Sequence, residues 1–105
     1  MRVQTIVHEM VARLVERFGP DMVILFGSHA RGDADQDSDV DLLVVMPEAS
    51  DRRPLAVAMR RALRGMGLPK DVLVLSRAEY EAERDIPGSL AYPASHDGTV
   101  LYARG

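Results

Sequence analysis

Apolar residues recur at every third or fourth position through the first eighteen residues of the chain. This spacing places them along one face of a helix, and Gly19-Pro20 follows as a stop signal. The pattern therefore predicts a helix over residues 3–18. Its buried face consists of Val3, Ile6, Val7, Met10, Val11, Leu14, Val15 and Phe18.

Four runs of strand length come after this helix. Residues 21–26 form an apolar run that stops abruptly at Gly27, as expected for a buried strand that ends in a turn. Residues 39–46 alternate between two sets of side chains, which predicts a second strand. A third strand is predicted over residues 71–75 and a short last one over residues 99–102.

Shorter helical segments lie between these strands. Residues 28–31 have the composition of one helical turn, and a longer helix is predicted from the cap at Ser50-Asp51 to the stop at Gly65. A capping-box spacing predicts another helix near residues 77–84. Beyond Asp85, prolines and glycines predict turns rather than a helix.

Together these elements predict a mixed α/β (α+β) fold, with a small twisted sheet and flanking helices packed on one main side. The length of 105 residues fits a single domain over residues 1–105. A domain of this size has little room for a separate acceptor-binding part. Recognition of a substrate is therefore expected to depend on the substrate itself or on a second subunit.

Charge and composition exclude several classes of function. The chain has 13 basic and 16 acidic residues and a net charge of −3, so no overall basic field favours binding to nucleic acid. It has no cysteine, which fits a reducing cytoplasmic location and excludes disulfides and thiolate metal sites. No apolar run is long enough to cross a membrane.

Gly27-Ser28, followed by Asp39-Val40-Asp41, is the pattern with the clearest chemistry. A glycine after a buried strand lets a phosphate approach the backbone, and the N–H groups that begin the next helical turn point at an anion. In a strand, Asp39 and Asp41 project from the same face. Two such carboxylates are suitable ligands for one or two magnesium ions, which carry a triphosphate with them.

Other interpretations of the same residues are possible. The acidic loop resembles the start of a calcium-binding loop, but Ser38 stands where that loop needs glycine and Val44 where it needs glutamate. Ser28 lacks the surroundings of a covalent nucleophile, so its hydroxyl and N–H are expected to hold phosphate. Arg31 suits either a phosphate or the acidic loop, and His29 is the one histidine beside the phosphate turn.

The residues from Gly27 to Gly32, with those from Ser38 to Leu42, resemble the signature of the nucleotidyltransferase superfamily related to DNA polymerase beta. The short length is similar to that of the minimal nucleotidyltransferases, which include antitoxins that transfer AMP to a tyrosine of a HEPN-domain ribonuclease toxin. The resemblance implies a nucleotidyltransferase-like fold, with the active site at the end of the first two strands.

The resemblance also implies a third carboxylate on a later strand, for which Asp71 is the candidate. Lys70 precedes it where the family has an apolar residue, so Asp71 as a plain strand-start residue stays an alternative. The implied catalytic and metal-binding residues are Asp39, Asp41 and Asp71, with Mg²⁺ as cofactor. The implied contacts to ATP, the nucleotide substrate, are made by Gly27, Ser28 and Arg31.

Three functions follow from the resemblance and the small size. The first is a magnesium-dependent protein adenylyltransferase that acts as the antitoxin of a HEPN toxin, with which it forms a hetero-oligomer. The second is a nucleotidyltransferase with a small-molecule acceptor, of the aminoglycoside type. The third is an antitoxin that covers its partner without catalysis.

Overall fold

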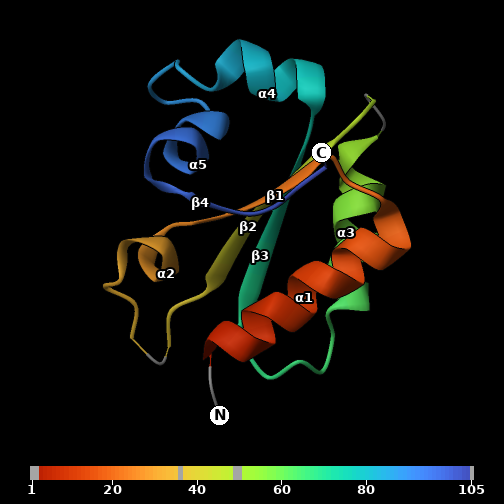
Figure 1. Cartoon of the computed structure of the whole chain (residues 1–105), viewed down its shortest axis with the longest axis vertical. Coiled ribbons are helices and arrows are strands. Elements are labelled where there is room, and N and C mark those ends of the chain that lie inside the picture. The colour runs from red at the N-terminus through yellow and green to blue at the C-terminus, as the bar shows by residue number, and fades with distance from the viewer. Residues whose placement is uncertain (1–2, 36, 49–50, 105) are drawn as a thin grey trace.

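A four-stranded sheet forms the centre of the computed structural model, which describes residues 3–35, 37–48 and 51–104. The strand order is β3-β2-β1-β4 (Figure 1). Strand β1 pairs antiparallel with both β2 and β4, whereas β2 and β3 are parallel. The strands are β1 (Met22–Phe26), β2 (Val40–Met46), β3 (Lys70–Ser76) and β4 (Thr99–Ala103).

Helices cover both faces of this sheet (Figure 1). Helices α1 (Val3–Phe18) and α3 (Arg52–Ala62) pack on one face, and α4 (Arg77–Glu83) and α5 (Ala91–Asp97) pack on the other. The expectation of helices on one main side was therefore wrong. The physical reason lies in β2, whose side chains are apolar in both directions, so that each face needs a cover.

The two cores follow the alternation of side chains along β2. Val40, Leu42 and Val44 face α1 and α3, whereas Leu43 and Val45 face α4 and α5. All five are fully buried. The start of β2 lies at the end of the sheet where β1 finishes, because the two strands are antiparallel and Asp41 is opposite Phe26.

Most predicted elements are confirmed, with small shifts at their ends. The first helix has the predicted bounds, and the Ser76–Glu79 capping box is present in full. The Asp51 side chain accepts a hydrogen bond from the Arg53 N–H, while Ser50 lies outside the described residues.

Helix α5 was not predicted, because Pro93 was interpreted as a helix breaker. Pro93 is the third residue of this helix. The first turn of a helix does not use its N–H groups within the helix, so a proline is tolerated there.

Among the described residues, no helix is both long and apolar enough to cross a membrane.

Candidate active site

The turn after β1 has the backbone that the sequence suggested for a phosphate site. Gly27 has φ 76° and ψ −156°, a conformation that a side chain would oppose. Helix α2 (Ser28–Arg31) starts directly after it and ends at Gly32, which is left-handed. The N–H groups of Ala30 and Arg31 both donate to the Gly27 carbonyl. Those of Ser28 and His29 begin the helix, where N–H groups have no partner within it.

The Asp41 carboxylate lies directly against Gly27. A Cβ at Gly27 would overlap its Oδ2 atom, so glycine is required here for space as well as for backbone conformation. In the sheet, Asp41 is opposite Phe26 of β1 and opposite Asp71 of β3. Asp41 therefore lies between the Gly27 turn and the carboxylate-bearing residue Asp71.

Asp71 is the second residue of β3, which begins one residue earlier than predicted, at Lys70. The Lys70 side chain is accommodated because its Nζ donates to the Leu68 carbonyl at 2.9 Å. By the alternation of side chains along a strand, Asp41 and Asp71 lie on the same face of the sheet as the residues that contact α4 and α5. Asp39 precedes β2, which begins at Val40, so the predicted strand started one residue too early.

The three carboxylates are close enough to affect one another electrostatically. Burial raises the pKa of Asp41 above its ordinary value of 3.8, and the charges of Asp71 and Asp39 raise it further. His29 and Arg31 act in the opposite direction. A site that concentrates negative charge in this way favours a cation or a positively charged complex.

This raised pKa predicts a particular dependence of stability on pH. Above pH 3.8 the Asp41 carboxyl keeps its proton more readily in the folded chain than in the unfolded chain. The free energy of unfolding therefore falls as pH rises from 3.8 through the raised pKa of Asp41 in the folded chain. Asp41→Asn should therefore be more stable than the parent at pH 7 and equally stable below pH 3.8. Urea unfolding across this pH range measures the difference, and identical pH profiles for the two proteins would contradict it.

The carboxylates form an all-oxygen donor set, which is the chemistry that magnesium prefers. In the described part of the chain, no three acidic, histidine or cysteine side chains lie close enough together to hold a metal ion. Asp71 instead has an ion pair with Arg60 of α3, at 3.7 Å between Oδ1 and Nη2, with both side chains half-exposed. Arg60 had no signal in the sequence, because the contact depends on how α3 packs beside β3. Asp41 and Asp71, which are opposite each other in the sheet, supply oxygen donors of the kind that magnesium prefers, and binding of the ion by Asp39, Asp41 and Asp71 stays a prediction.

Arg31 contacts the acidic loop rather than the turn. Its Nε lies 3.4 Å from the Asp33 carboxylate, and both side chains are exposed. An exposed pair of this kind is weak and leaves the guanidinium able to exchange partners.

Comparison with known proteins agrees with this geometry. Residues 7–86 match the family described as "Nucleotidyltransferase domain". The match covers three quarters of the chain, including α2 and the parts of β1, β2 and β3 that carry the site.

The chain belongs to this nucleotidyltransferase family. A relative in Methanocaldococcus jannaschii, "Putative protein adenylyltransferase MJ1305", is 46% identical over 50 residues, which are 46% of this chain and 34% of that protein. The alignment thus spans about a third of the relative's length.

Solved structures share the fold. A structure described as "a putative nucleotidyltransferase from Sulfolobus solfataricus" has a TM-score of 0.67 and 24% identity over 95% of this chain and 79% of the other. A structure described as a toxin-antitoxin with AMP-PNP has a TM-score of 0.59 and 22% identity, over 92% and 73% of the two chains. These likenesses confirm the nucleotidyltransferase fold.

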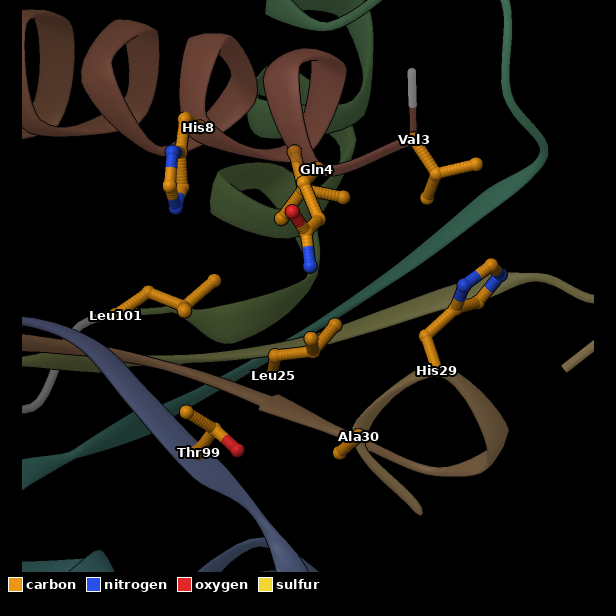
Figure 2. A pocket seen from close by; sticks show the side chains of 9 residues that line it. Val3, Gln4, His8, Leu25, His29, Ala30, Thr99 and Leu101 are labelled. Atoms are coloured by element: carbon orange, nitrogen blue, oxygen red, sulfur yellow. The ribbon is translucent and has the colours of Figure 1, made fainter. Parts of the chain in front are cut away.

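A separate cavity of about 360 Å³ lies behind the phosphate turn of this nucleotidyltransferase domain. Figure 2 shows Gln4 and His8 from α1, and His29 and Ala30 from α2, around a floor that includes Leu25. Leu25 lies on the face of the sheet that α1 and α3 cover. Asp41 alternates with the residues of that face and lies on the face that α4 and α5 cover. The cavity and the carboxylates are therefore on opposite sides of the sheet.

His29 is the cavity residue with a defined role in the turn. Its Nε2 lies 3.1 Å from the Ser38 carbonyl, and Ser38 directly precedes Asp39. This contact joins the short helix to the end of the acidic loop.

Removing this contact has an expected cost. His29→Ala should lower the free energy of unfolding by about 1 kcal/mol, the usual worth of one half-buried hydrogen bond. The control is His8→Ala, which lines the same cavity from an exposed position and should change stability by less than about 0.5 kcal/mol. Urea unfolding of both variants makes the comparison. Equal losses would show that His29 only fills space.

Proposed function

We propose that this chain is a magnesium-dependent nucleotidyltransferase that transfers AMP from ATP to a hydroxyl group of a partner protein. The acceptor is a tyrosine of a HEPN-domain toxin in the cytoplasm, and the transfer makes this chain the antitoxin. The observation that carries the proposal is the Asp41 carboxylate packed against Gly27 and opposite Asp71. This contact supports the proposal because it brings the turn proposed to bind phosphate next to the carboxylates proposed to bind the metal.

In this proposal the turn binds the donor nucleotide. The N–H groups of Ser28 and His29 hold the β and γ phosphates, Gly27 allows their close approach, and Arg31 adds positive charge at the rim. Asp39 and Asp41 would hold magnesium, which would supply positive charge to neutralise the phosphates when bound. The half-exposed Asp71 completes the metal site and orients the acceptor hydroxyl.

The reaction is a substitution at the α-phosphorus. The acceptor oxygen forms a bond to phosphorus, the bond from phosphorus to the bridging oxygen of the β-phosphate breaks, and pyrophosphate leaves. The hydroxyl proton passes to the Asp71 carboxylate or to water beside it. Most of the rate comes from positioning these groups in line and from stabilising charge.

A protein acceptor is supported by two observations. The relative in Methanocaldococcus jannaschii is named as a protein adenylyltransferase, and one structure with the same fold is described as a toxin-antitoxin with an ATP analogue, AMP-PNP.

The test is to incubate the purified chain with magnesium, ATP and the helical product of a neighbouring gene, and to measure intact masses. The proposal expects the neighbour to gain the mass of one or more AMP groups, with the modified residue identified as tyrosine by fragmentation. Binding without a mass change would favour an antitoxin that only covers its partner. AMP transfer to aminoglycosides, with none to the neighbour, would favour a small-molecule acceptor.

A further inference from the structure

Positive charge is concentrated in one part of this acidic chain. Residues 51–70 contain six of the 13 basic residues and one of the 16 acidic residues, a local charge of +5, while the rest of the chain carries −8. We name these six residues the basic edge. The basic edge consists of Arg52, Arg53, Arg60, Arg61, Arg64 and Lys70.

Much of this charge has no partner inside the described chain. Arg52 pairs with Glu79 at 3.3 Å and Arg60 with Asp71 at 3.7 Å, whereas the described residues offer Arg53, Arg61 and Arg64 no ion pair. All three are exposed. Structural ion pairing therefore does not explain why these arginines gather on one surface.

Two adjoining hollows lie along the basic edge. The first, of about 540 Å³, is bounded by arginines of α3, by Val57 and by Leu90. The second, of about 500 Å³, is bounded by Arg61, Arg64 and Lys70. Val57 and Arg60 belong to both, so the hollows are continuous. Val57 and Leu90 are 43% and 52% exposed, which gives the surface an apolar strip among its charges.

The first hollow lies beside the edge strand of the sheet. Val72, Leu73 and Val74 of β3 border it together with arginines of α3. Strand β3 is the last strand on this side of the described sheet (Figure 1). Val72 and Val74 are buried, so they line the hollow as apolar side chains beneath the exposed arginines.

The basic edge also leads to the candidate active site. Arg60 contacts Asp71, and Asp71 is opposite Asp41. A segment that lies along β3 would therefore have one end beside the carboxylates where the acceptor hydroxyl is expected.

We propose that the basic edge binds an extended acidic segment of the acceptor protein, which lies along α3 and β3. This inference rests on the proposed function, because it assigns the acceptor to this side of the site. The partner is a polypeptide because the surface combines exposed apolar side chains with arginines. None of the residues that border the two hollows is aromatic, so bases have nothing to stack on.

The test is an NMR titration of the isotopically labelled full chain with a short peptide of alternating glutamate and valine. The amide signals of Val72, Leu73 and Val74 should shift, and a lysine–valine peptide should leave them unchanged. Arg61→Glu should weaken binding about tenfold, since it removes a charge-assisted contact and adds repulsion. Arg17→Glu is the matched control, because Arg17 is also an exposed helix arginine and borders neither hollow.

The apolar strip has its own matched pair of variants. Leu90→Asp should weaken binding of the peptide, whereas Ile86→Asp should not, although the two side chains are equally exposed. Shifts caused by an oligothymidylate of the same charge, and stronger than those of the peptide, would replace the polypeptide with a nucleic acid and overturn the inference. Equal effects of Arg61→Glu and Arg17→Glu would overturn it too, because the basic edge would then make no contact of its own with the peptide.

The binding test and the function test fail separately. Peptide binding requires no ATP and no transfer. AMP transfer to a partner, without any peptide binding at β3, would overturn the docking site and leave the proposed function intact. Binding at β3 without AMP transfer to any protein would overturn the proposed function instead.

Discussion

Replacing Asp39 and Asp41 together by asparagine should abolish AMP transfer, with a loss of at least about a thousandfold in rate. Asparagine keeps the size of each side chain and removes the charge that holds a divalent cation. The free energy of unfolding should not decrease, because repulsion around Asp41 is relieved. The measurements are AMP incorporation into the partner and urea unfolding of the double variant.

A second double variant supplies the control. Asp33→Asn with Asp37→Asn removes the same number of charges from the acidic loop that precedes β2, at exposed positions. Asp33 contributes only an exposed ion pair with Arg31, so transfer should be nearly unchanged. Full activity of the Asp39 and Asp41 double variant in a folded state would eliminate the proposed mechanism.

Gly27→Ala should cause the second-largest effect, on both stability and nucleotide binding. The added Cβ meets the Asp41 carboxylate in a backbone region that only glycine occupies easily. We expect a loss of roughly 2–3 kcal/mol in the free energy of unfolding, from backbone strain and displacement of Asp41 together. ATP binding, measured by calorimetry with magnesium, should fall below detection.

Gly32→Ala separates strain from steric overlap. Gly32 also has a positive φ, of 83°, but a Cβ there meets nothing within 4 Å. It should lose only about 1 kcal/mol and retain ATP binding. If both glycine variants bind ATP equally well, the contact between Gly27 and Asp41 is not part of the nucleotide site.

The sequence predicted the elements better than their arrangement. The first helix and the Gly27 turn could be predicted because their signals are local: a periodic apolar face, and a glycine that ends a buried strand. Helix α5 was missed because a proline such as Pro93 is tolerated in the first turn of a helix but breaks a helix in its middle. The cover on the second face was missed for the same reason, since α5 is part of it.

The candidate site was predicted as a set of residues but not as a geometry. Asp39 and Asp41 are close in sequence, so their neighbourhood could be inferred from strand alternation. The pairing of Asp41 with Asp71 depends on the register between β2 and β3, which no local pattern encodes. The contact of Arg60 with Asp71 depends in addition on helix packing, so it became visible only in the structure.

The register of the sheet also has a consequence for folding. Asp41 pairs with Phe26 across two antiparallel strands that are close in sequence. It comes opposite Asp71 only when the chain has crossed over through α3 and placed β3 parallel to β2. Parallel pairings of this kind form late, because a long loop must close first. The carboxylates should therefore come together in one of the last steps of folding, and a chain still emerging from the ribosome would hold the turn before it could assemble the full acidic site.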